Sequence, residues 1–155
     1  MATGHWLTNK GKKYLIDGGW TDAAGTDIQV GLVQTNQPAT VDTQAEVADL
    51  DFVSSLLVTA GATEATFTNY ARTALTRSAA AEDDTNDRVN MDASDVVWTS
   101  AGGATNNTLF GAFIFDNTGG ADTSKILISV DWFAASITTN GGNFTYAIAD
   151  LYRAS

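Results

Sequence analysis

The chain has 155 residues, 44% of them hydrophobic and 17% charged, which is enough apolar material for one folded core and too little charge for a disordered chain. Its 18 Asp and Glu against 8 Lys and Arg give a net charge of -10, which argues against binding to a nucleic-acid backbone or an anionic membrane surface. Cysteine is absent, which excludes disulfides, thiolate metal sites and cysteine nucleophiles. His5 is the single histidine, so a conventional Ser-His-Asp triad would have to use this residue as its base.

A short helix is predicted at the N-terminus, capped by Thr8 or Asn9 and ended by Gly18-Gly19. Thr and Asn side chains accept hydrogen bonds from free amides at a helix start, and glycine ends helices because it adopts positive φ. The helix carries three lysines, Lys10, Lys12 and Lys13, so residues 14–155 hold a charge of 5 − 18 = −13. This basic terminus is interpreted either as a solvated helix face or as a contact site for an acidic partner.

A strand with one buried face is predicted from residue 27 on, because Ile28, Val30 and Leu32 alternate with polar or small residues. A turn-rich stretch, residues 35–40, follows and contains the only proline. Residues 43–57 are ambiguous: their spacing favours one or two short helices, although residues 52–59 also fit a strand.

Beyond Gly61 the chain is rich in Thr, Ala, Val and aromatic residues, with Gly and Asn clusters between the apolar stretches. Six strands are predicted there, at residues 67–78, 88–91, 96–99, 109–115, 125–133 and 143–151. The last has the clearest alternation, with Phe144, Tyr146 and Ile148 on one face. Short strands separated by such turns predict a mainly β chain of one domain, an antiparallel β-sandwich or barrel with a short N-terminal helix and minor helical segments.

The densest acidic stretch contains Glu82, Asp83, Asp84 and Asp87. Carboxylates at alternate loop positions can bind calcium, but the glycine and the closing glutamate of an EF-hand loop are missing here. The stretch follows three alanines, residues 79–81, which favours a solvated hairpin over a preformed metal site.

A search for catalytic motifs finds none in the sequence. A phosphate-binding loop, a G-x-S-x-G elbow and an H-E-x-x-H motif are missing, and Glu64 lies between small residues, a poor setting for a catalytic carboxyl group. We therefore expect a noncatalytic protein with no cofactor and no metal. No apolar run approaches the roughly 18–20 residues of a membrane span, and the first residues lack the apolar stretch of a secretory signal.

The four tryptophans allow two interpretations. Aromatic faces stack on sugar rings, so exposed tryptophans would suit a carbohydrate-binding surface. Trp98 and Trp132 follow apolar residues inside predicted strands, which favours core or interface positions. Trp6 and Trp20 flank the N-terminal helix, and we expect them to fix it onto the sheet or onto a neighbouring subunit.

Five segments form an ordered pattern over most of the chain. They are a helix ending in Gly-Gly (12–19), a strand entering a Thr-rich loop (28–36), a Tyr-Ala-Arg run (70–75), an aromatic strand with Gly and Asp (110–116) and the closing residues 137–146. This order resembles a group of small virion proteins of tailed bacteriophages, whose "YARQAV" and "HFGLWDA" elements are similar to the third and fourth segments. Two positions depart from that pattern: Thr73 stands in place of the usual Gln, and no His precedes Phe110.

The resemblance implies a noncatalytic, β-rich subunit that decorates or cements the outer surface of a capsid, often as a trimer, with the major capsid protein as its partner. Attachment to the tail, collar or fibre is the alternative within the same class. A carbohydrate-binding module, with calcium at Asp83, Asp84 and Asp87, is the alternative from another class, and a hydrolase is a remote third.

The charge of the chain suits the outside of a capsid. Packed DNA is a dense polyanion, which would repel a chain of net charge -10 from the inner wall. We predict that residues 1–20 dock onto the capsid, because they combine aromatic anchors with complementary charge. The predicted docking residues are Trp6, Lys10, Lys12, Lys13, Tyr14 and Trp20. The competing interpretation is an ordinary terminal helix that completes the chain's own core.

Overall fold

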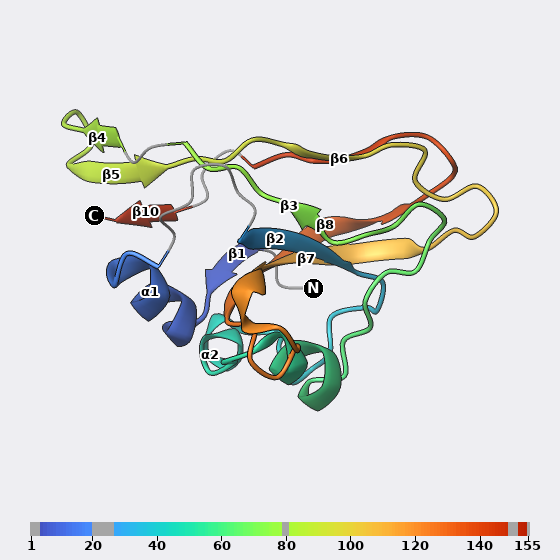
Figure 1. Ribbon diagram of the computed structural model, residues 1–155, viewed down its shortest axis with the longest axis horizontal. Coiled ribbons are helices and arrows are strands. Elements are labelled where there is room, and N and C mark those ends of the chain that lie inside the picture. Colours follow the sequence, from blue (N-terminus) through green and yellow to red (C-terminus); the bar gives the residue numbers. More distant parts are fainter. Residues whose placement is uncertain (1–3, 20–26, 79–80, 149–151, 155) are drawn as a thin grey trace.

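A computed structural model describes residues 4–19, 27–78, 81–148 and 152–154 of the chain. Its centre is a five-stranded antiparallel sheet with the strand order β1-β8-β7-β2-β3 (Figure 1). The strands of this sheet are β1 (Gly4–Leu7), β8 (Leu127–Thr138), β7 (Thr108–Asp116), β2 (Ile28–Val33) and β3 (Thr73–Ala74). The mainly β, antiparallel fold predicted from the sequence is confirmed, whereas a sandwich or a barrel stays a prediction.

Two smaller antiparallel sheets accompany the central one. One has the order β10-β5-β4, and the other pairs β6 with β9. Their strands are β4 (Ala81–Asp83), β5 (Arg88–Met91), β6 (Val96–Trp98), β9 (Phe144–Tyr146) and β10 (Tyr152–Ala154). The β4–β5 pair is the hairpin that the acidic stretch predicted.

Four helical segments lie in the described residues, namely α1 (Asn9–Ile16), α2 (Gln44–Ala48), the π-helical turn η1 (Ser55–Thr59) and the 3₁₀ turn η2 (Asn117–Gly119). Thr8 caps α1 as predicted, and Gly18, with a φ of 73°, follows its last turn. The helical interpretation of residues 43–57 is confirmed by α2 and η1. None of these described helices is long and apolar enough to cross a membrane.

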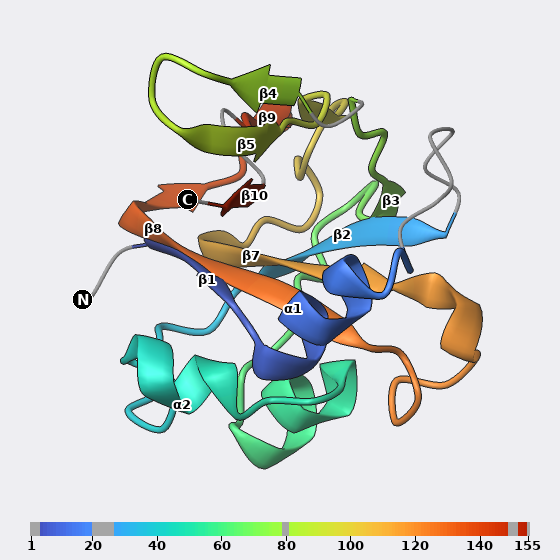
Figure 2. The same ribbon diagram turned by 90° about the vertical axis from the view of Figure 1, so that its left-hand side faces the viewer.

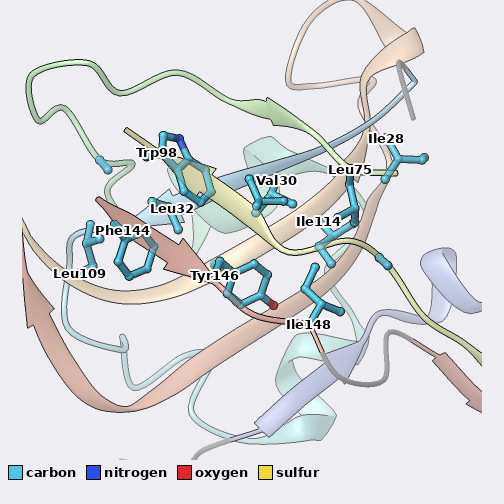
Figure 3. Packing of buried hydrophobic residues seen from close by; sticks show 14 of the residues in the cluster. Ile28, Val30, Leu32, Leu75, Trp98, Leu109, Ile114, Phe144, Tyr146 and Ile148 are labelled. Atoms are coloured by element: carbon cyan, nitrogen blue, oxygen red, sulfur yellow. The ribbon is translucent and has the colours of Figure 1, made fainter. Parts of the chain in front are cut away.

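The central sheet is buried on both faces. Figure 1 and Figure 2 show α2 on one side of it and the β6–β9 pair on the other. Along β7, Ala112 and Ile114 belong to the core cluster under β6 and β9, which Figure 3 shows, while Phe113 and Phe115 belong to the cluster under the helices. The prediction of one buried face for β2 is therefore wrong, because the helices cover its second face.

The strand predicted at residues 67–78 is wrong over most of its length. Only β3 forms there, because the backbone of this segment bonds to loops instead of to a neighbouring strand. The amide of Thr68 donates to the carbonyl of Thr105, and the amide of Gly102 donates to the carbonyl of Thr68. Asn69 also has a φ of 71°, which interrupts an extended chain.

The remaining predicted strands are confirmed with shifted ends. β5 has the predicted bounds, β6 ends one residue earlier, and β7 is one residue longer at each end. β8 begins two residues later than expected and ends five residues later. The alternation of Phe144, Tyr146 and Ile148 is confirmed by their burial, although β9 itself ends at Tyr146. β1 was not predicted, because its four residues show no strand period of their own.

Candidate functional site

The predicted N-terminal docking segment is built into the central sheet. β1 pairs with residues 129–132 of β8. Thr8 then ties α1 to the same strand, because its Oγ1 donates to the carbonyl of Leu127 at 2.5 Å and accepts from the amide of Gly11 at 2.8 Å. A Cβ atom at Gly11 would overlap the backbone of Ile128, so the helix lies directly against β8. Removing this segment would remove a strand of the sheet.

Two of the three lysines of α1 have acidic neighbours in the chain itself. The ammonium of Lys10 lies 3.9 Å from Asp51 Oδ2, and Lys13 forms an ion pair with Asp17 one helical turn further on. Lys12 forms no ion pair within the residues that the structure describes. The positive surface of the helix is therefore smaller than three lysines suggest.

The aromatic residues of the same segment face different parts of the core. Trp6 is half-buried against the cluster under the helices, whereas Tyr14 packs against the cluster under β6 and β9. The Tyr14 hydroxyl donates to the carbonyl of Gly19 at 2.6 Å, and burial together with two nearby aspartates raises the pKa of Tyr14 to about 12. Trp20 lies outside the described residues. Of the predicted residues that the structure describes, Trp6 and Tyr14 pack against different core clusters, and docking by this segment stays a prediction.

A cluster of charged side chains that the sequence did not predict surrounds Arg72. The Arg72 cluster consists of Glu64, Tyr70, Arg72, Asp122 and Lys125. Arg72 donates to both oxygens of Glu64, at 2.8 and 2.7 Å, and to both oxygens of Asp122, at 2.6 and 2.7 Å. Tyr70 donates to Glu64 at 2.6 Å and accepts from the amide of Leu32 in β2 at 3.0 Å. The cluster therefore joins β2 to two loops that are distant in the sequence.

The groups of the Arg72 cluster shift one another's pKa values. Hydrogen bonds to Asp122 and then to Glu64 raise the pKa of Arg72, and the bonds from Arg72 lower the pKa of Asp122. Burial and the Glu64 carboxylate raise the pKa of Tyr70. The guanidinium also lies 5.0 Å from the ring centroid of Phe115. These shifts favour the charged forms of Arg72 and Asp122 and the neutral form of Tyr70, and the hydrogen bonds behind them hold the joined segments in place.

Part of this cluster carried a signal in the sequence. Tyr70 and Arg72 stand two residues apart, so in an extended segment their side chains point the same way. That spacing could have predicted a shared partner, and Glu64 was the nearest carboxylate before them. Asp122 lies 50 residues beyond Arg72 and has no local signal.

The acidic hairpin uses its carboxylate inside the chain. Asp83 accepts hydrogen bonds from the Asn86 side chain at 2.9 Å and from Arg88 Nε at 2.7 Å, and these bonds lower the pKa of Asp83. In the described residues no group of three His, Asp or Glu side chains is placed to hold a metal ion. The calcium ligand set considered for Asp83, Asp84 and Asp87 gains no support from this geometry.

Neither tryptophan of the predicted strands forms an exposed platform. Trp98 and Trp132 are both buried, as the core interpretation predicted. Trp98 Nε1 donates to the carbonyl of Ala71 at 2.8 Å, and the Trp98 ring lies 5.8 Å from that of Phe144. A sugar-binding surface would therefore have to use other aromatic residues.

A hollow of about 640 Å³ opens beside the end of β8. It is lined by residues 131–135 and 137 of β8 and by residues 144–147 in and after β9. The ring of Phe133 lies 6.2 Å from Phe144 and 6.1 Å from Tyr146. The buried Tyr146 hydroxyl donates to Asp131 Oδ2 at 2.9 Å, and burial raises the pKa of Tyr146. Except for Asp131, the lining is apolar or neutral.

The pairing of β8 with β7 is interrupted in the second half of β8 and resumes at Ile137 and Thr138. β1 pairs with β8 only as far as Trp132, and the register of β7 passes from Gly111 opposite Trp132 to Leu109 opposite Ile137. Residues 133–136 thus have no register partner on either side among the described strands. Residues 134–138 are exposed, and Ile137 keeps 44% of its surface accessible. We call residues 133–138 the outer half of β8.

Comparison of the chain with protein-family models, with curated proteins and with solved structures finds no match. Two features remain open to a partner: the exposed face of α1 and the outer half of β8 with its hollow.

Proposed function

We propose that the protein is a noncatalytic structural subunit of a tailed-bacteriophage virion, and most directly a decoration protein that binds the outer surface of the head and stabilises it. The observation that carries this proposal is the outer half of β8, an exposed and uncharged strand segment beside an apolar hollow. Such surfaces serve protein–protein assembly, because soluble monomers normally protect strand edges with charges or cover them.

The Arg72 cluster supports the same proposal. Its Tyr-Ala-Arg run is one of the segments on which the resemblance to virion proteins rests, and its side chains join β2 to two loops. A subunit that reinforces a shell under internal pressure needs such cross-links and needs no cofactor. The net charge of -10 favours a position outside the shell, away from packed DNA.

The proposed partner is the major capsid protein, and the exposed face of α1 is the proposed contact. Lys12 and Ile16 are four residues apart and therefore lie on one face of the helix. Lys12 has no ion pair among the described residues, and Ile16 is 77% exposed in the last turn. An apolar side chain beside a positive charge suits an acidic, partly apolar capsid surface.

Binding to heads tests this function. We expect the protein to sediment with intact heads at a fixed copy number, and Ile16→Ser to weaken that binding about fivefold to tenfold. Val58→Ser is the matched control, because Val58 is 78% exposed at a helical turn of another surface.

Two outcomes would contradict the proposal. Recovery of the protein only on isolated tails would assign it to the tail, collar or fibre. Equal binding by the Ile16 and Val58 variants would place the capsid contact outside α1.

A further inference from the structure

The loop between β8 and β9 contains the only Asn-Gly pair of the sequence, Asn140-Gly141. An asparagine that precedes glycine is prone to deamidation, because glycine has no side chain to keep its amide nitrogen away from the neighbouring carboxamide. Asn140, Gly141 and Gly142 are all exposed, so water and base can reach them. The loop is therefore a candidate site of covalent modification.

Deamidation at this position needs only water as a co-reactant. The deprotonated amide nitrogen of Gly141 attacks Cγ of Asn140, which closes a succinimide ring, breaks the Cγ–Nδ2 bond and releases ammonia. Water then opens the ring at either carbonyl and leaves aspartate or isoaspartate in place of the asparagine. Nothing is oxidised or reduced, and a neutral side chain becomes a carboxylate.

The folded chain holds both reacting groups. The amide of Gly141 donates to the carbonyl of Ala101 at 2.7 Å, and the amide of Ala101 donates to the carbonyl of Gly142 at 2.7 Å. Ala101 is buried, so these two bonds fix the loop to the interior. Oδ1 of Asn140 accepts from the amide of Gly142 at 3.0 Å, which orients the carboxamide. Because a hydrogen-bonded N–H loses its proton less readily than a free one, the nucleophile forms less readily while the Ala101 bond is intact.

A side-chain bond ties the same two loops together. Oδ1 of Asn143 accepts from the amide of Ser100 at 3.1 Å. Asn143 follows Gly142 directly, and Ser100 directly precedes Ala101, so this contact lies beside the two backbone bonds. Opening of the loop at Asn140 is therefore opposed by a bond that a substitution can remove.

The product carboxylate would lie in a stretch of the chain that has no charge. Residues 132–149 contain no Asp, Glu, Lys, Arg or His, and neither do residues 96–115, which supply the facing loop. Figure 1 shows these loops at the end of the molecule opposite the β4–β5 hairpin. Deamidation would thus place a negative charge, irreversibly, on a neutral end of the fold.

We propose that Asn140 is a latent deamidation site, that the bonds with Ala101 lock it in the folded chain, and that its conversion records how long this loop has been open. Only when residues 140–142 leave Ala101 is the Gly141 amide free to lose its proton and attack. The site belongs to the chain itself and does not depend on the capsid assignment.

Peptide mapping by mass spectrometry measures the conversion at Asn140 after incubation of the folded, full-length chain in mildly alkaline buffer. A synthetic peptide of residues 137–145 gives the rate without the fold. We expect the folded chain to convert at least about tenfold more slowly than the peptide, because the Ala101 bonds must open first. The protection of the Gly141 amide in hydrogen exchange should equal this slowing within about threefold, since one opening step controls both.

Asn143→Ala tests the lock and leaves residues 140–142 unchanged. Loss of the contact with Ser100 should raise the conversion rate about threefold to tenfold. Asn86→Ala is the matched control, because Asn86 is an exposed asparagine in the turn of the β4–β5 hairpin, away from this loop. We expect that variant to convert at the wild-type rate.

Several outcomes would overturn the proposal. A folded chain that converts as fast as the peptide, or a Gly141 amide that exchanges without protection, would show that Ala101 does not lock the site, and neither measurement needs a variant. An Asn143→Ala chain that converts no faster than the wild type would do the same. Equal acceleration by Asn86→Ala would indicate general loosening of the fold, and earlier conversion of another asparagine would place the site elsewhere.

Discussion

Around Arg72, the guanidinium, both carboxylates and the tyrosine hydroxyl have partners inside the chain, whereas along the outer half of β8 four consecutive residues have no ladder partner in the described sheets. Both regions adjoin the central sheet. In the first, buried polar groups satisfy one another, which fixes three segments and leaves nothing for a ligand. In the second, the backbone of residues 133–136 has no ladder partner among the described strands, and a segment of this kind can pair with another extended chain. The Arg72 cluster thus holds segments of the fold together, whereas the outer half of β8 is a part of the sheet that the proposed function leaves for a partner.

The largest effect is expected from Arg72→Met, which removes the centre of the cluster. The partly buried Glu64 carboxylate would lose its counter-charge and Asp122 would keep only Lys125, 3.5 Å away, so the free energy of unfolding should fall by about 2–3 kcal/mol. Urea unfolding measures this loss. Arg88→Met is the matched control, because Arg88 pairs with Asp83 in the hairpin between β4 and β5, and less than about 1 kcal/mol is expected there. Equal losses in the two variants would show that the cluster does not carry special stability.

A smaller effect is expected from acid. The pKa of Asp122 is lowered in the folded chain by its bonds with Arg72, so its stabilising contribution is complete above the unfolded pKa of about 3.9 and is lost as the pH falls through the lower folded value. Between pH 5 and 2 we therefore expect the stability difference between the wild type and Arg72→Met to narrow. A difference that stays constant over this range would contradict the assigned ion pair.

The smallest effect is expected in the outer half of β8. Ser136→Ala changes an exposed side chain in the segment without ladder partners, so the free energy of unfolding should change by less than about 0.5 kcal/mol. Thermal and urea unfolding of dilute protein measure it. A loss comparable to that of Arg72→Met would mean that this half of the strand supports the fold and is not reserved for a partner.

Local signals in the sequence predicted local structure well. The cap at Thr8, the glycines after α1 and the β5 strand all follow from residues within a few positions of one another. The apolar alternation around Tyr146 also predicted which residues are buried.

The features that failed depend on partners distant in the chain. β1 became a strand because β8 offers it an edge, and residues 67–78 stayed irregular because loops bond to their backbone. The Arg72–Asp122 pair joins residues 50 positions apart, so no local sequence pattern predicts this ion pair. The sequence also did not show that Trp6 and Tyr14 pack in part against the chain's own core, because those contacts too are distant in the chain, and docking by this segment stays a prediction.

The order β1-β8-β7-β2-β3 also determines which strands can pair first during synthesis. β1 has no partner until the ribosome has made residue 132, and the bond from Thr8 to Leu127 spans 119 positions. β2 likewise has to wait for β7. In this sheet, only the β7–β8 and β2–β3 pairs join strands that are consecutive in the sequence. Chains with such distant contacts fold slowly, over about milliseconds to seconds, because the entropy cost of closing a long loop comes before its contacts stabilise the chain. β1 is therefore synthesised long before β8 and stays without this partner until β8 emerges.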